Sequence, residues 1–151
     1  MAIFCCLFCL ISLSFPANSE EPVHATADYD PDNVFARIIR GELPADIVYE
    51  SEYALAFHDI RPMVKVHVLV IPKGPYTNIM TFNANASDAE KLGFLDAISQ
   101  TATVMGVDES GFRLVSNTGR HGHQTVPHLH VHVLGGEPVK YRSPRAIPVH
   151  E

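Results

Sequence analysis

The chain has 151 residues, of which 46% are hydrophobic and 19% are charged, a balance typical of one globular domain and not of a disordered chain. Its formal net charge of −6 argues against broad affinity for a nucleic-acid polymer, although it permits a small nucleotide in a local pocket. The three cysteines are Cys5, Cys6 and Cys9, so they supply no disulfide or cysteine zinc site to the core.

Residues 1–30 read as an apolar leader and a polar linker, which we exclude from the fold. The run 1–15 is too short to span a membrane stably. It resembles the apolar region of a secretory signal, with Ala17–Ser19 as a small-residue cleavage site. No Lys or Arg precedes the run, so a mis-assigned start or a disordered leader stays an alternative. The domain then covers residues 31–136, and a C-terminal tail covers residues 137–151.

The first part of the domain predicts a short helix and a hairpin. Asn33 precedes apolar residues at the spacing of one helical face, which predicts a helix over residues 34–39 that Gly41 ends. Residues 47–49 and 53–58 are short apolar runs separated by a polar turn, and they predict two antiparallel strands.

The remaining elements define the fold class. Residues 66–71 alternate, with valines on one face and His67 on the other, and predict a strand. A capping-box sequence followed by apolar residues at helical spacing predicts a long helix over 87–105. Residues 112–116 and 129–134 predict two more strands. We therefore expect an α+β fold, an antiparallel sheet of about five strands with two main helices packed on one face.

The segment Pro127–Leu134 carries the most informative pattern. Alternate residues of a strand share a face, so His128, His130 and His132 should point to one side while the apolar residues between them point into the core. Three charged imidazoles in a row would repel one another, so at least one should be neutral near pH 7.

Such a row has three chemical uses, which are metal binding, general acid–base catalysis and attack of an imidazole nitrogen on phosphorus. Adjacent residues on one face of a straight strand do not converge on a single ion. Metal binding by this segment alone is therefore disfavoured, and a metal would more readily take His128 and His130 together with a distant ligand such as His67. A polar strand face without a role is the remaining alternative.

The spacing His128-x-His130-x-His132, followed by two hydrophobic residues, resembles the signature of the histidine-triad (HIT) family, and most closely its Hint-like branch of purine nucleoside phosphoramidases. The likeness covers about residues 32 to 136 and implies a HIT-like fold. It includes the segments 35–44, 56–60, 67–73 and 117–135.

The resemblance implies an enzyme that cleaves the P–N or P–O bond of nucleoside 5′-phosphoramidates or adenylates without a metal or cofactor. His130 would attack the α-phosphate to form a nucleotidyl-histidine, and water would release the nucleoside monophosphate. The carbonyl of His128 would hold the Nδ1 proton of His130. His132, His67 and Thr125 would bind the phosphate and stabilise its developing charge. The alternatives are a dinucleoside polyphosphate hydrolase, a non-catalytic purine nucleotide-binding protein and a metal-dependent hydrolase.

The resemblance also implies a nucleotide pocket, in which Asp59 accepts hydrogen bonds from the ribose hydroxyls. For the apolar members, a place in the core explains the residue type equally well. The further nucleotide-binding residues implied are Phe35, Ile38, Leu43, Phe57, His58, Ile60, Asn117, His123 and Gln124.

Two residues depart from the pattern of the Hint-like branch. Thr125 stands where a serine is common, and His123 stands where a small residue is common. No Cys-x-x-Cys precedes the domain, so the structural zinc of some relatives has no such ligands here.

The resemblance implies a homodimer through the helix over 87–105 and the strand from Phe112. It also implies a cytoplasmic location, with export as the alternative if residues 1–19 are a cleaved signal.

Overall fold

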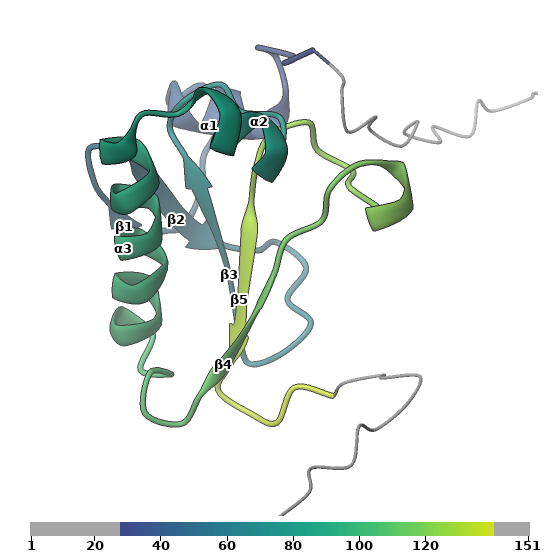
Figure 1. Ribbon diagram of the computed structural model, residues 1–151. Helices are drawn as coiled ribbons and strands as arrows, with labels where there is room; N and C mark the ends of the chain where they lie inside the picture. Colours follow the sequence, from purple (N-terminus) through teal and green to yellow (C-terminus); the bar gives the residue numbers. More distant parts are fainter. Residues whose placement is uncertain (1–27, 141–151) are drawn as a thin grey trace, which may run out of the picture.

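The computed structural model describes residues 28–140 (Figure 1). The signal-like run, its cleavage site and the tail beyond residue 140 lie outside the described residues. The described chain contains a five-stranded antiparallel sheet in the order β1-β2-β3-β5-β4. The strands are β1 (Ile47–Glu50), β2 (Ala54–His58), β3 (Val66–Pro72), β4 (Phe112–Val115) and β5 (Val131–Gly135). The helices are α1 (Val34–Ile39), α2 (Ile79–Asn85), α3 (Asp88–Val104) and the short 3₁₀ helix η1 (Arg120–Gly122). The expected α+β fold is confirmed.

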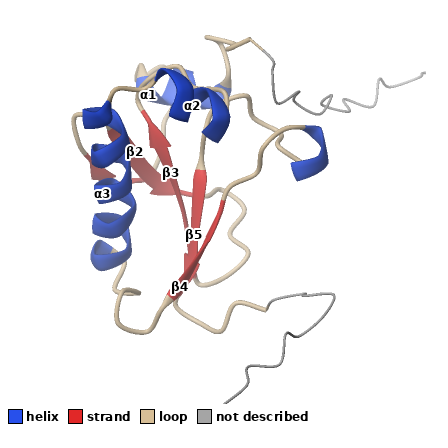
Figure 2. Cartoon of the chain, viewed as in Figure 1, coloured by secondary structure: helices blue, strands red, loops and turns tan. Residues whose placement is uncertain are grey.

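The long helix α3 covers one face of the sheet (Figure 2). Ser87 caps its N-terminus in the predicted capping box, because its hydroxyl accepts from the Glu90 amide while the Glu90 carboxylate accepts from the Ser87 amide. The helix packs against β1, β2, β3 and β5. The main core lies between them and includes the three valines of β3, as the alternation predicts.

A second, smaller apolar cluster lies on the opposite face of the sheet. Phe35 of α1 packs there with Leu55, Phe57, Leu69 and Ile71. The expectation that the helices share one face is therefore wrong for α1. The physical reason is that every residue of β3 is buried, so this central strand needs cover on both faces.

The sequence prediction missed α2, which precedes α3. Asn78 and Thr81 form a capping box at its start, but Phe82 is its one buried residue, so apolar periodicity gives little signal.

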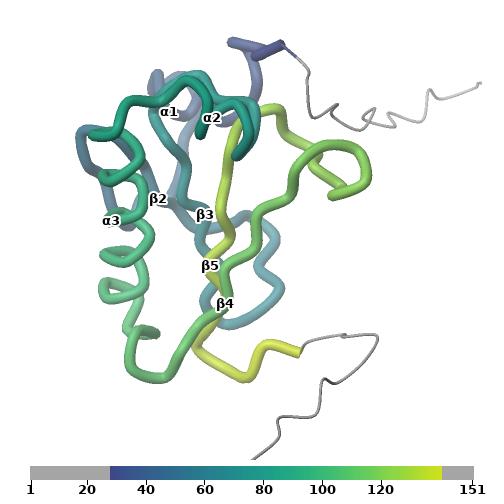
Figure 3. The backbone as a smooth tube through the Cα atoms, viewed as in Figure 1, coloured from purple at the N-terminus to yellow at the C-terminus, as the bar shows by residue number. Residues whose placement is uncertain are grey.

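Figure 3 shows the chain running from β4 through the η1 loop to β5. The predicted strand over 129–134 begins later, at Val131, and the Leu129 amide instead donates to the Tyr76 carbonyl. None of the helices within residues 28–140 is long and apolar enough to cross a membrane.

Candidate active site

The three triad histidines share the face of the sheet opposite α3. Leu129, Val131 and Val133 alternate with them and lie in the main core, as predicted. Although only His132 belongs to β5, the alternation continues back through the extended residues before the strand. The rings of His128 and His130 make edge contacts with the ring of Phe35, which α1 brings to this face. The chain therefore places one helix against the row of imidazoles.

The proton positions of His130 follow from its hydrogen bond. Its Nδ1 atom lies 2.8 Å from the carbonyl oxygen of His128. A carbonyl can only accept, so Nδ1 donates and Nε2 of the neutral ring keeps a lone pair. Burial lowers the pKa of His130 below its ordinary value, which favours that neutral form. The Ser116 hydroxyl donates to the carbonyl of His130 at 3.1 Å, so the main chain at this position is held as well.

His128 is fully buried and has hydrogen-bond partners at both ring nitrogens. Its Nε2 atom lies 2.8 Å from the carbonyl oxygen of Pro72, and its Nδ1 atom lies 2.8 Å from the hydroxyl of Tyr29. The Pro72 carbonyl requires Nε2 to donate, so Nδ1 accepts the Tyr29 hydroxyl proton. Burial lowers the pKa of His128 to about 4, which keeps the ring neutral at pH 7.

His67 and His132 form a second hydrogen-bonded pair. The Met63 amide donates to Nδ1 of His67 at 3.2 Å, and Nε2 of His67 lies 2.8 Å from Nδ1 of His132. The Asp59 carboxylate lies 3.4 Å from the same Nε2 atom. Burial lowers the pKa of His67 and, with the neighbouring histidines, lowers the pKa of His132 to about 4. Both rings are therefore neutral at pH 7.

A cavity of about 800 Å³ opens in front of His130 and His132. Of the predicted catalytic set, His130, His132 and Thr125 line it, whereas His128 and His67 lie outside its lining. Asn117, His123 and Gln124 are not among the lining residues. The predicted nucleotide-binding residues that line it are Phe35, Ile38, Leu43, Phe57, His58, Asp59 and Ile60.

Gln124 and His123 belong to the loop beside this cavity. The buried Gln124 amide oxygen accepts from the Gly119 amide, and its nitrogen donates to the carbonyls of Thr77 and Val126. These bonds use the side chain to brace the loop. His123 is exposed and has a φ of 55°, a left-handed conformation that favours glycine.

Sequence reasoning missed part of the lining. Arg61 is one such residue, and its amide donates to a carboxylate oxygen of Asp59 at 2.7 Å, which closes a local turn. Its position two residues after Asp59, a predicted pocket residue, is the one sequence feature that could have indicated it. The other missed residues flank predicted ones, follow α1 or lie on β3: Val34, Pro44, Ala45, Asp46, Leu69 and Val126.

The residues suited to a metal differ from the set considered from the sequence. One ligand atom each from Asp59, His67 and His132 lies within 4.8 Å of the others, and this is the group that the described residues offer. The structure does not bring together His128, His130 and His67, the set that the sequence left as the alternative for a metal. Both nitrogens of His128 and Nδ1 of His130 are already hydrogen-bonded to protein atoms, so the two rings have too few free nitrogens.

Comparison with known proteins decides the family, because residues 40–139 match the model of the HIT domain. The chain belongs to the HIT family. Tyr29 and α1 precede the matched segment of the HIT domain.

Named relatives of this HIT protein agree with that assignment. It is 52% identical over 108 residues to an uncharacterised 13.2 kDa HIT-like protein of Azospirillum brasilense, covering 72% of this chain and 88% of the relative. It is 41% identical over 112 residues to a purine nucleoside phosphoramidase of Escherichia coli, covering 72% and 90%. A crystal structure of a HIT family hydrolase from Legionella pneumophila matches with a TM-score of 0.67 at 37% identity, covering 72% of this chain and 96% of that one.

Proposed function

We propose that this HIT protein is a hydrolase that cleaves nucleoside 5′-phosphoramidates or adenylates through a nucleotidyl-histidine. The observation that carries the proposal is the hydrogen bond from Nδ1 of His130 to the carbonyl of His128, which leaves Nε2 as an unprotonated nucleophile at the cavity. Imidazole attacks readily at neutral pH and leaves readily once it has been phosphorylated and protonated, so it suits a two-step transfer.

In the first step Nε2 of His130 bonds to the α-phosphorus as the P–N bond breaks, and the leaving amine takes up a proton from solvent. In the second step water bonds to the phosphorus as the P–Nε2 bond breaks, the electron pair returns to Nε2, and the proton of the attacking water passes to solvent. This releases the nucleoside monophosphate and restores the neutral His130 ring. The Thr125 hydroxyl and Nε2–H of His132 are donors for the phosphate oxygens, whose negative charge grows in both transition states.

The rest of the cavity fits a nucleoside. Asp59 offers carboxylate oxygens to the ribose hydroxyls, while apolar side chains form a slot for a planar base. The members of that slot are Phe35, Ile38, Leu43, Phe57 and Ile60. A purine is the proposed base because the Escherichia coli relative is a purine nucleoside phosphoramidase.

A substrate panel tests the proposal. The parent chain should hydrolyse adenosine and guanosine 5′-phosphoramidates faster than a diadenosine polyphosphate. His130→Ala should lose the activity, whereas His121→Ala, an exposed loop variant, should keep it. Faster turnover of the diadenosine polyphosphate would favour the dinucleoside alternative. Tight binding of AMP without turnover of any substrate would favour a nucleotide-binding protein.

A metal-dependent hydrolase is the second candidate, and the group of Asp59, His67 and His132 is the observation that favours it. Neutral imidazole nitrogens and a carboxylate oxygen are ligands that Zn²⁺ accepts. We rank it lower because Nε2 of His67 and Nδ1 of His132 are hydrogen-bonded to each other, and a shared ion would have to break that bond.

We also propose that the protein forms a homodimer through α3 and β4. β4 is an edge strand of the sheet, and Phe112 and Leu114 on it are 38% and 47% exposed. Leu92 and Leu95 of α3 are 69% and 64% exposed. An open strand edge and exposed apolar side chains are both surfaces that a second copy would cover.

A further inference from the structure

We propose that Tyr29 is a positioning residue that holds His128 and, through it, the nucleophile His130. The inference rests on the proposed function, since it concerns how the attacking nitrogen is aimed. Tyr29 lies 99 residues before His128 in the chain and outside the segment that matches the HIT domain. The matched family pattern therefore assigns it no role.

The contact between the two side chains is specific. The Tyr29 hydroxyl lies 2.8 Å from Nδ1 of His128, and the two rings meet edge-on with their centroids 5.6 Å apart. The Nε2–H group of His128 donates a hydrogen bond to the Pro72 carbonyl, so Nδ1 has only a lone pair to offer. Tyr29 must then be the donor. Its burial raises the pKa of the phenol, so the hydroxyl stays protonated near neutral pH.

The contact reaches the nucleophile through the main chain. With both nitrogens bonded, the fully buried ring of His128 has one tautomer and one orientation. The carbonyl of the same residue accepts the Nδ1 proton of His130. A change in the orientation of His128 would therefore move its carbonyl oxygen. That oxygen is the acceptor that orients the His130 ring and its Nε2 atom toward the cavity. Partners that fix the tautomer and orientation of a functional histidine commonly have this indirect effect.

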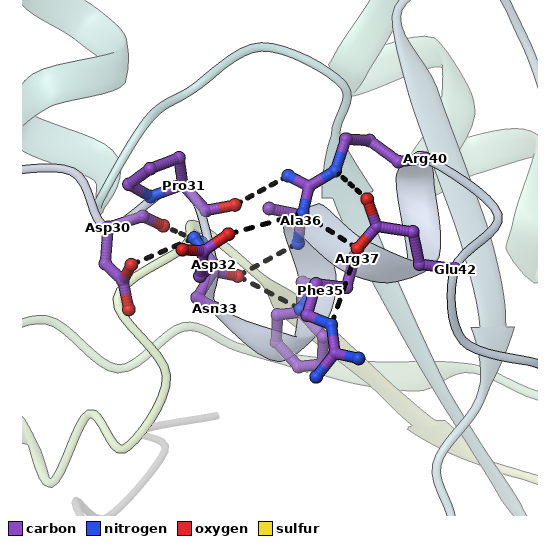
Figure 4. Close-up of polar contacts among 9 residues, drawn as sticks. All are labelled: Asp30, Pro31, Asp32, Asn33, Phe35, Ala36, Arg37, Arg40 and Glu42. Atoms are coloured by element: carbon purple, nitrogen blue, oxygen red, sulfur yellow. Dashed lines mark hydrogen bonds and ion pairs between the residues drawn. The ribbon is translucent and has the colours of Figure 1, made fainter.

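Residues 30–33, which directly follow Tyr29, make polar contacts with α1 (Figure 4). Arg40 at the end of α1 donates to the Pro31 carbonyl at 2.6 Å, and the side-chain nitrogen of Asn33 donates to the Asp30 carbonyl at 2.6 Å. The side-chain oxygen of Asn33 caps α1 by accepting from two amides of its first turn. These bonds fix residues 30–33, so the residue before them is presented to His128 by a rigid support.

The same helix supplies the other neighbour of the two rings. Phe35 of α1 meets His128 and His130 edge-on, with ring centroids 6.2 and 5.2 Å away. One local structure, built from residues 29–35, therefore contacts His128 by a hydrogen bond and both histidines by ring packing. Residues 29–35, which precede the segment that matches the HIT domain, therefore help to hold both histidines in place.

The test is Tyr29→Phe in the full chain, with Tyr49→Phe as the matched control. Tyr49 is half-buried in β1 against the main core, so its variant also loses one phenol hydroxyl but away from the site. We expect kcat of Tyr29→Phe on a nucleoside phosphoramidate to fall about tenfold, with KM and thermal unfolding little changed, because the nucleophile is misaimed and the substrate still binds. Tyr49→Phe should keep the parent kcat. A parent-like kcat in Tyr29→Phe would overturn the proposal.

A spectroscopic measurement separates this claim from the proposed function. The ¹⁵N resonance of Nδ1 of His128 should move in Tyr29→Phe, because that nitrogen loses its donor, and should stay unchanged in Tyr49→Phe. A fall in kcat with an unmoved His128 resonance would also overturn the proposal. If the parent hydrolyses no phosphoramidate, the proposed function fails. The resonance alone then decides whether Tyr29 holds His128.

Discussion

Nε2 of His67 lies 2.8 Å from Nδ1 of His132, although the two residues are 65 positions apart in the chain. The Met63 amide occupies Nδ1 of His67, so the proton of the neutral His67 ring sits on Nε2 and is donated to His132. His132 must then carry its own proton on Nε2. The strand pairing of β3 with β5 thereby sets a hydrogen-bond donor at the cavity before substrate arrives, and a preset donor needs no rearrangement in the transition state.

The buried neutral histidines make stability depend on pH. The pKa of His128 is about 4 in the folded protein, below the ordinary 6.5, so between these values the unfolded chain binds the extra proton. The free energy of unfolding should therefore fall as the pH drops from 6.5 to 4 and level off below. His128 alone contributes up to about 3 kcal/mol, at about 1.4 kcal/mol per pKa unit. Urea unfolding across this range measures the effect.

His128→Gln is the informative variant for this prediction. Glutamine keeps one donor for Pro72 and one acceptor for Tyr29 but does not titrate. Its unfolding free energy should depend less on pH than that of the parent, whereas the exposed-loop variant His121→Gln should keep the parent slope. Equal slopes in the parent and His128→Gln would contradict the assignment of the pH effect to this ring.

The carboxylate of Asp59 is expected to recognise the ribose. Asp59→Asn should raise KM by roughly tenfold, since it removes a charged acceptor for the hydroxyls. Asp108→Asn, which changes an exposed carboxylate outside the cavity lining, should leave KM near that of the parent. A 2′,3′-dideoxy substrate should have a raised KM with the parent, and Asp59→Asn should raise that KM no further. Additive losses from the two changes would show that Asp59 acts elsewhere.

Hydrolysis should not require a divalent metal. The attacking nitrogen belongs to His130, and the ligand atoms of the candidate metal group belong to Asp59, His67 and His132. We therefore expect the rate of phosphoramidate hydrolysis to be unchanged after treatment with EDTA and dialysis. Loss of activity that zinc restores would instead support the metal-dependent alternative.

The homodimer proposal predicts a molar mass of twice 16.6 kDa by light scattering of the full chain. Leu114→Glu on β4 should yield the monomer, because it places a charge on the surface that the second copy covers. Met80→Glu on α2 changes a residue that is 65% exposed and belongs to neither α3 nor β4, and should stay dimeric. A monomeric parent would remove the proposal.

The sequence predicted the faces of β3 and β5 correctly because side chains alternate with a period of two and both strands have apolar residues on one face. The valines of β3 and the residues between the triad histidines lie in the main core, as this alternation predicts. It also placed α3, whose capping box and length are local signals. The region around α2 carries one buried apolar residue, so periodicity offered no comparable signal there.

The site was predicted less completely because much of it depends on pairs that are distant in sequence. The contact of Tyr29 with His128 and that of His67 with His132 arise from packing, and no spacing rule encodes them. The ligand set considered for a metal differed from the one in the structure for the same reason. It considered the spacing along one strand, whereas the nitrogens of His128 were already used by partners elsewhere in the chain.

The nucleotidyl form of His130 is the most direct test of the central claim. The parent chain is mixed with an adenosine 5′-phosphoramidate, quenched without acid within one turnover and analysed by peptide mass spectrometry. The account predicts one adenylyl group, placed on the peptide at His130, absent from His130→Ala and lost again as AMP appears. Hydrolysis at the parent rate by His130→Ala, or an adenylyl group on another residue, would contradict it.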